Sequence, residues 1–372
     1  MIFGKEKGAE LEMAEQDLHY FMRGNTAQGL VSLADSIFQG LGTIYVLQGF
    51  PGGTEAMMGR IAAALEQRGF SLQRIHQPLD HESLEGIIVT NLSFGIVDGN
   101  AWSVNAEPVG ADIRYIDLCS VLDTDKLEDS SEEIERLQRQ IDTAYEQAYD
   151  TFLKTLRIHD DWEKIYIDHL DREAMNTLAA EWSEQYLQPV RAGKRAQIVH
   201  RFLGAATWRG AIDFVPNLTD RLQTRIYVKG RPGSGKSTLF KSLAASAELK
   251  GIDMEVYHCG FDPNSLDMLI FPELGIAIFD STAPHEHFPV RQGDQILDVY
   301  QLAIAEGTDE KFAEAVLAFK NRYAASMKQS ISYLAEAREL RDQLKDIYQE
   351  AAAEGSLFPL ERTILSGIEA RV

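Results

Sequence analysis

Cysteine is scarce in this sequence of 372 residues, which contains only Cys119 and Cys259. That scarcity excludes a disulfide-stapled scaffold and favours a reducing compartment. Long apolar runs are missing too: the longest, 266–279, is interrupted by Pro272 and Glu273 and falls short of the roughly 20 residues that a membrane-spanning helix needs. The opening MIFGKEKGAELEMAEQ also lacks the apolar core of a signal peptide. We therefore expect a cytoplasmic protein that does not associate with membranes.

Basic residues are outnumbered, since 36 lysines and arginines face 57 aspartates and glutamates, and the formal net charge is −21. Such a charge disfavours extended binding to nucleic acid, although it allows a local basic groove. We expect the partners to be nucleotides, other small molecules or proteins. The length exceeds that of one ordinary core and suits two domains.

The two halves of the chain resemble each other. At a shift of 181 residues, HYFMRGNTAQG (19–29) superposes on HRFLGAATWRG (200–210). One added residue moves the shift to 182, and the register continues with identities that include Gly69 with Gly251, His76 with His258, Asp80 with Asp262, and Asp98 with Asp280. Self-similarity of this extent predicts a duplicated domain, with boundaries at 15–188 and 195–370 and pairing of the two repeats within the chain.

Each half shows the same order of elements. A β-branched run is followed by a glycine-rich loop, a helix, a second strand and a third apolar run that ends in aspartate. The expected ranges are 43–47, 57–67, 72–76 and 93–98 in the first half, and 225–228, 238–249, 254–258 and 275–280 in the second. This alternation predicts an α/β fold in which each half is a three-layer domain with a parallel sheet.

The rear of each half is expected to be helical. Apolar residues recur at steps of three and four between 134 and 152 and between 316 and 334, which is typical of amphipathic helices whose apolar stripes pack. A lid or a partner surface is the alternative. A single helix from 309 to 353 would be about 67 Å long. We therefore expect a helical hairpin in each half.

The strongest chemical signal is GRPGSGKS at 230–237, which satisfies the phosphate-loop pattern G-x-x-x-x-G-K-[ST] between a predicted strand and a predicted helix. Glycines let successive N–H groups turn inward, and the helix N-terminus adds partial positive charge. Lys236 would neutralise the phosphates of ATP or GTP, and the Ser237 hydroxyl would coordinate Mg²⁺. The expected cofactor-binding residues are Gly230, Arg231, Pro232, Gly233, Ser234, Gly235, Lys236, Ser237 and Thr238.

Asp280 ends the apolar run GIAIFD, at the edge of the sheet where the loop should lie. It is the expected second anchor of Mg²⁺ and, with Lys236, a catalytic residue. A helix or turn cap is the alternative. Ser281 follows it, where many ATP-hydrolysing machines place a glutamate base.

The segment GRPGSGKST resembles P-loop NTPases, and its spelling is similar to that of small-molecule and nucleotide kinases of the adenylate-kinase kind. This resemblance covers the loop, its strands and Asp280. The duplicated layout, with GFDPNSLDM at 260–268 and FDSTAPHE at 279–286, is also similar to a family of bacterial tandem P-loop ATPases. That second resemblance covers most of the chain, and it implies nucleotide binding without naming a substrate.

The corresponding loop of the first half, GFPGGTEA at 49–56, keeps the glycines and the proline but has Glu55 and Ala56 at the positions of Lys236 and Ser237. A carboxylate repels phosphate, and alanine offers no hydroxyl to the metal. The first half is therefore predicted to be a scaffold that binds no nucleotide.

Polar residues gather after two predicted strands of the second half. The candidates for a substrate site, near the γ-phosphate or the acceptor, are His258, Asp262, His285 and His287. His76 and Asp80 stand at the equivalents of the first two, so a structural role is the alternative for them. Two histidines without clear further ligands are weak evidence for zinc.

Together these features predict an ATP- or GTP-binding protein whose second half hydrolyses or transfers the γ-phosphate with Mg²⁺. A kinase for a small acceptor is one alternative, and a nucleotide-controlled interaction protein with little turnover is another. The catalytic base and any transition-state arginine stay open, with Arg201, Arg231 and Arg291 as candidates for the arginine.

Overall fold

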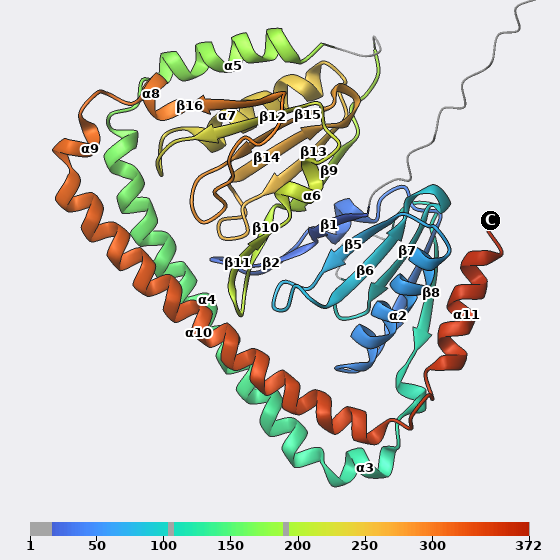
Figure 1. Cartoon of the computed structure of the whole chain (residues 1–372). Coiled ribbons are helices and arrows are strands. Elements are labelled where there is room, and N and C mark those ends of the chain that lie inside the picture. Colours follow the sequence, from blue (N-terminus) through green and yellow to red (C-terminus); the bar gives the residue numbers. More distant parts are fainter. Residues whose placement is uncertain (1–16, 103–107, 189–192, 372) are drawn as a thin grey trace, which may run out of the picture.

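The computed structural model describes residues 17–102, 108–188 and 193–371. The opening segment MIFGKEKGAELEMAEQ, residues 1–16, lies outside these ranges. It includes residue 15, the predicted start of the first domain. None of the described helices is long and apolar enough to cross a membrane. The fold is α/β, with helices around one twelve-stranded central sheet (Figure 1).

Six strands from each half form the central sheet, in mirrored order. From the centre outward, those of the first half are β1 (Leu18–Phe21), β5 (Leu72–His76), β6 (Leu84–Val89), β7 (Phe94–Asp98), β4 (Thr43–Gln48) and β8 (Asp112–Asp117). Those of the second half are β9 (Ile198–Phe202), β13 (Met254–His258), β14 (Leu266–Phe271), β15 (Ile276–Asp280), β12 (Thr224–Lys229) and β16 (Asp294–Asp298). At the centre β1 and β9 pair antiparallel, so the sheet is continuous across both halves.

The sheet is mostly parallel, but β6 and β14 each run antiparallel to both of their neighbours. The prediction of a purely parallel sheet is wrong at these two strands. The cause is the short connection: only residues 259–265 separate β13 from β14, whereas a parallel crossover needs about a dozen residues or more. Every residue of β14 is buried, which agrees with the apolar run noted in the sequence.

Helices follow the two loops directly, as predicted. They are α2 (Gly53–Gln67) after β4 and α7 (Lys236–Leu249) after β12. The shorter helices are α1 (Ala34–Ile37), α3 (Thr124–Asp129), α6 (Val215–Thr219), α8 (Val299–Ala303) and α9 (Thr308–Lys311). Two small antiparallel hairpins, β2–β3 (Arg23–Thr26, Gly29–Ser32) and β10–β11 (Gly204–Thr207, Gly210–Asp213), lie outside the central sheet.

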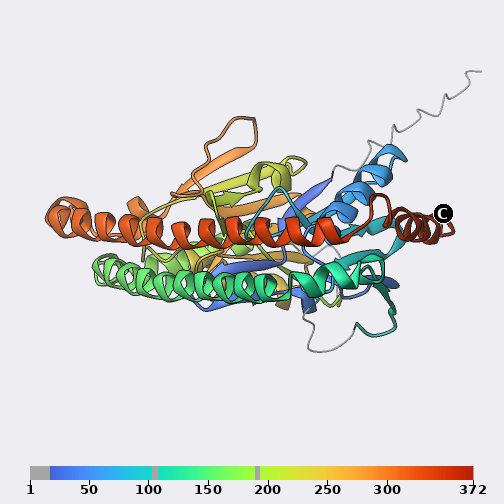
Figure 2. The same ribbon diagram turned by 90° about the horizontal axis from the view of Figure 1, so that it is seen from below.

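The predicted helical hairpins are wrong, because each rear segment is one continuous helix. These helices are α4 (Ser131–Ile167) and α10 (Ala313–Ala351), and they lie side by side along the molecule (Figures 1 and 2). They run antiparallel: Phe152 packs with Leu334, and the Thr155 and Ser326 hydroxyls are 2.6 Å apart. Each apolar stripe is covered by the helix of the other half, so neither helix has to fold back on itself.

The helices after this pair are exchanged between the halves. After α4, helix α5 (Arg172–Tyr186) places Met175 and Trp182 in the core around α7 of the second half. After α10, helix α11 (Phe358–Glu369) places Ile364 and Ile368 in the core around α2 of the first half. Each half thus completes the core of the other, while the domain boundaries read from the repeat stay a prediction.

Candidate functional site

The loop 230–235 joins the end of β12 to the start of α7 in a tight turn. Gly233 and Gly235 have φ values of 75° and 88°, which only glycine adopts without strain. A Cβ atom on Gly230 would lie 2.5 Å from the Ser234 hydroxyl. The turn therefore depends on its glycines, and it ends at the N-terminus of a long helix, where backbone N–H groups lack helical partners.

Lys236 and Asp280 lie together beside this loop. The Lys236 Nζ atom is 3.1 Å from the Arg231 carbonyl oxygen and 3.5 Å from a carboxylate oxygen of Asp280. Asp280 also accepts hydrogen bonds from the backbone N–H and the hydroxyl of Thr282. The structure thus brings the predicted cation and the predicted metal anchor to one place.

The remaining loop residues have various surroundings. The Ser237 hydroxyl oxygen accepts a hydrogen bond of 3.0 Å from the Leu266 amide, which ties the start of α7 to β14. Ser234 is buried and its hydroxyl donates to the Arg231 carbonyl. Pro232 is half-buried, and Thr238 is exposed at the start of α7.

The three candidate arginines lie in different places. Arg231, on the loop, forms an ion pair with Asp309 at 2.8 Å and lies over the Tyr300 ring. Arg201 is buried in an ion pair with Glu255, and Arg291 donates to backbone carbonyls at and just after the end of α6. Among the three, only Arg231 lies on the loop.

His258 lies at the centre of the sheet. One ring nitrogen is 2.9 Å from His200 and the other is 2.7 Å from the Pro263 carbonyl oxygen. In the first half His19 and His76 form the equivalent pair, at 2.8 Å. The repetition of this pair favours the structural alternative for His258.

His285 and His287 share one carboxylate, that of Asp213 at the end of β11, at 2.9 and 3.0 Å. Burial alone would lower the pKa of His285, but its hydrogen bond to Asp213 and the charges of Asp213, Asp267 and Asp280 raise it above the usual value. His285 is therefore coupled by charge to Asp280 beside the loop, and His287 contacts the same Asp213 carboxylate. Sequence reasoning missed Asp213, which lies outside every motif.

Acidic residues gather around Lys236. Asp267, which sequence reasoning also missed, is buried on β14, and burial followed by the charge of Asp280 raises its pKa to about 6. A charged residue inside the buried run LDMLIF was the available sequence signal. Asp262 belongs to the same cluster and lies in the loop that connects β13 to β14. Its carboxylate accepts a hydrogen bond from the Asn264 amide.

Helix α4 adds three residues from the first half of the chain. The ligand atoms of His159, Asp160 and Glu163 lie within 4.8 Å of one another, and the Glu163 carboxylate accepts a hydrogen bond of 3.1 Å from the Gly233 amide. Burial lowers the pKa of His159 and raises that of Glu163. Sequence reasoning assigned this helix to the other repeat and could not place it here.

In the loop of the first half, residues 49–56, the Glu55 carboxylate binds a backbone amide of the loop itself. Glu55 accepts a hydrogen bond of 2.7 Å from the Gly52 amide. Lys345 and Arg341, both on α10, lie 3.4 and 3.5 Å from its other carboxylate oxygen. Burial would raise the pKa of Glu55, but these two cations outweigh burial and lower it.

Two further acids of the first-half site also have a basic partner, whereas burial raises the pKa of Asp98, the equivalent of Asp280. Asp80 pairs with Arg338 at 3.0 Å, and Glu85 pairs with Arg23 at 2.6 Å. In the repeat register, Glu85 corresponds to Asp267. None of the three cations has a lysine or arginine as its repeat equivalent: Arg23 corresponds to Gly204 of the second half, and Arg338 and Arg341 of α10 correspond to Leu156 and His159 of α4. Within the described part of the chain, neither Asp262 nor Asp267 has an ion pair with lysine or arginine.

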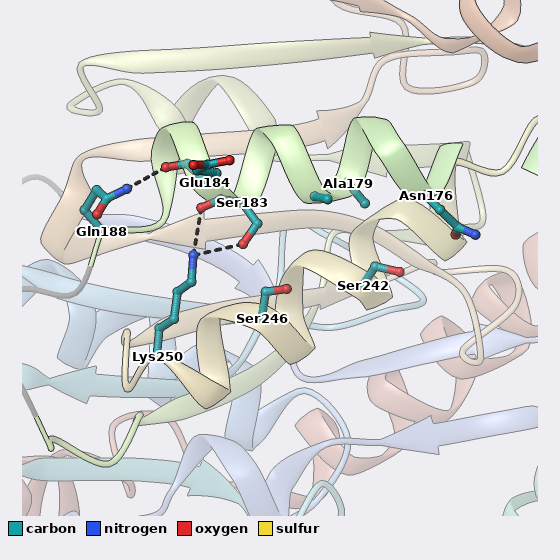
Figure 3. Close-up of a pocket in the computed structure, with 9 residues that line it drawn as sticks. Asn176, Ala179, Ser183, Glu184, Gln188, Ser242, Ser246 and Lys250 are labelled. Atoms are coloured by element: carbon teal, nitrogen blue, oxygen red, sulfur yellow. Dashed lines mark hydrogen bonds between the residues drawn. The ribbon is translucent and has the colours of Figure 1, made fainter. Parts of the chain in front are cut away.

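A separate groove of about 490 Å³ lies between α5 and α7, away from the loop (Figure 3). Its lining is polar, with Ser183, Ser242 and Ser246 among the side chains. Lys250 is the cation in it, and its Nζ atom already donates to the Ser183 and Leu187 carbonyls at the end of α5. Lys250 is therefore already engaged by the protein and is not free to bind an anion.

Comparison of the chain with protein-family models, with curated proteins and with solved structures finds no match.

Proposed function

We propose that the second half binds the phosphates of ATP or GTP with Mg²⁺ and hydrolyses or transfers the γ-phosphate, and that the first half binds no nucleotide. The observation that carries this proposal is the charge difference between two equivalent sites. The first has a cation for Glu55, Asp80 and Glu85, whereas the second combines one lysine with the acids Asp262, Asp267 and Asp280.

Carboxylate oxygens are among the ligands that Mg²⁺ prefers. In this proposal Asp280 and the Ser237 hydroxyl hold the ion, which would offset phosphate charge, and Lys236 with the amides of 231–238 holds the phosphate oxygens. The glycine φ values and the position of the loop before α7 support this role. Among the residues that the structure describes, Thr282 and Lys236 are the polar partners of the Asp280 carboxylate, which is compatible with a metal ligand.

Slow turnover is favoured by Ser281, which follows Asp280. Its side chain is buried and hydrogen-bonded to the backbone of His287, so it supplies no base. A nucleotide-controlled protein with little turnover is therefore the second candidate. Helix α4 supports it, because α4 contacts the loop at one end and packs along α10 beside the first half.

Calorimetric titration with a non-hydrolysable ATP or GTP analogue and Mg²⁺ tests binding. ADP or GDP release, measured alone and with pooled metabolites, then separates the activities. Release without additions indicates hydrolysis, and a sharp rise with one pool indicates a kinase. Tight binding with negligible release indicates a nucleotide-controlled protein. Absence of binding would refute the proposal.

A further inference from the structure

Helix α4 of the first half presses directly on the loop of the second half. The Gly233 amide donates to the Glu163 carboxylate at 3.1 Å. A Cβ atom on Gly233 would lie only 2.4 Å from the Glu163 carbonyl oxygen. Nothing larger than glycine fits under this helix, so Glu163 occupies a backbone donor of the kind that phosphate loops offer to phosphate oxygens.

The other loop has the same arrangement with the charges exchanged. Gly52, the equivalent of Gly233, also donates its amide to a glutamate, namely Glu55. In the repeat register Glu55 corresponds to Lys236, and Lys345, which pairs with Glu55, corresponds to Glu163. Each loop therefore has one carboxylate and one lysine beside it. At the first loop the carboxylate comes from the loop side and the lysine from α10, whereas at the second loop the lysine comes from the loop side and the carboxylate from α4.

This reversal changes how firmly each carboxylate is held. Glu55 belongs to its own loop and lies between two cations, Lys345 and Arg341. Glu163 is on a separate helix, and its nearest ion-pair partner in the described chain is His159 at 3.7 Å. Because burial raises the pKa of Glu163 whereas the cations lower that of Glu55, the carboxylate on the second loop is the less stabilised one.

We propose that Glu163 is a displaceable stand-in for a phosphate oxygen, which holds α4 on the loop until a phosphate ligand takes the Gly233 amide. This inference deepens the proposed nucleotide-binding function and rests on it. Two anionic groups cannot share one amide donor, so the ligand has to expel the carboxylate. The free energy of that step is subtracted from its affinity.

Glu163→Gln and Glu163→Ala test the inference, with Glu146→Gln as the matched control, because Glu146 is an exposed acid on the same helix. Calorimetry with Mg²⁺ and a non-hydrolysable ATP analogue gives the affinity. We expect Glu163→Ala to bind about tenfold more tightly than wild type, which corresponds to about 1.4 kcal/mol. We expect Glu163→Gln to bind more tightly by a smaller factor, because its amide oxygen still accepts from Gly233, and Glu146→Gln to match wild type.

Hydrogen exchange on the full chain gives a second measurement. The analogue should raise amide exchange in residues 159–167 of the wild type, because α4 leaves the loop, and should change it little in Glu163→Ala. Equal or weaker binding by both Glu163 variants, with no change in exchange, would overturn the inference while leaving nucleotide binding intact.

Tripolyphosphate is a probe that lacks the nucleoside. If tripolyphosphate binds, and binds Glu163→Ala more tightly than wild type, while nucleotides do not bind, then only the proposed function fails. No binding of either ligand would overturn both.

Discussion

The Nζ atom of Lys345 lies 3.4 Å from a carboxylate oxygen of Glu55. The second half of the chain thus supplies the cation that balances the acid in the loop of the first half. The Gly52 amide in GFPGGTEA donates to the same carboxylate. The glycine-rich turn thus holds an anion that belongs to the protein.

We expect Glu55→Gln to lower the free energy of unfolding by about 2 kcal/mol, because Lys345 and Arg341 lose their counter-charge in a half-buried site. Urea denaturation measures the loss, with the exposed Glu339→Gln on α10 as the control. The exchanged pair Glu55→Lys with Lys345→Glu should recover part of the stability. No recovery would show that geometry, and not charge balance, holds the contact.

Binding should be confined to one site per chain. Titration with a non-hydrolysable nucleotide and Mg²⁺ should give a stoichiometry near one. Lys236→Ala should abolish binding without unfolding the protein, because within the described chain its Nζ atom contacts the Arg231 carbonyl oxygen and Asp280 and no other polar group. Circular dichroism checks the fold of the variant. Two sites per chain, or binding that survives the substitution, would contradict the assignment.

Asp280→Asn should weaken the dependence on the metal more than the fold. The amide keeps an oxygen that can accept from Thr282 but removes the charge that would attract Mg²⁺. We expect the Mg²⁺ concentration for half-maximal nucleotide binding to rise by at least about tenfold, with little change in thermal stability. An unchanged Mg²⁺ requirement would exclude this role for Asp280.

Removal of a buried side chain from α11, which belongs to the second half of the chain, should destabilise the first half, because α11 packs in the first half's core. Ile368→Ala on α11 deletes a fully buried group from the core around α2 and should cost about 2–4 kcal/mol. The exposed Arg362→Ala on the same helix is the control. Hydrogen exchange should accelerate first in β4 and β7 of the first half. Acceleration confined to the second half would contradict the exchange of helices.

Stability should also fall as the pH rises above about 6.5. The folded pKa of His285 is raised by Asp213 despite burial, so its contribution is present below the unfolded pKa and is lost as the pH rises through the folded value. Asp213→Asn should flatten this dependence between about pH 6 and pH 8 and lower stability at pH 6. Urea midpoints at the two pH values measure it, and an unchanged slope would argue against the Asp213–His285 contact.

The sequence alone determined the local elements. The predicted strands 72–76 and 254–258 coincide with β5 and β13, and the helices after both loops begin only a few residues earlier than predicted. Alternation and glycine positions are local features, fixed by backbone sterics within a few residues. The repeat register likewise identified two positions where the halves differ in chemistry, since Glu55 and Ala56 of the first half stand where the second half has Lys236 and Ser237.

Only the tertiary structure decided which segments meet. The apolar stripes of α4 and α10 predicted that each helix packs against another element. Such a stripe does not specify which element, so the exchange of helices between the halves could not be predicted from it. For the same reason Glu163 could not be placed on Gly233, nor Lys345 beside Glu55, although the opposite charges stood at equivalent repeat positions. Contacts between residues far apart in the chain depend on the geometry of the whole sheet and the long helices, and that geometry places one repeat's helix on the other repeat's loop.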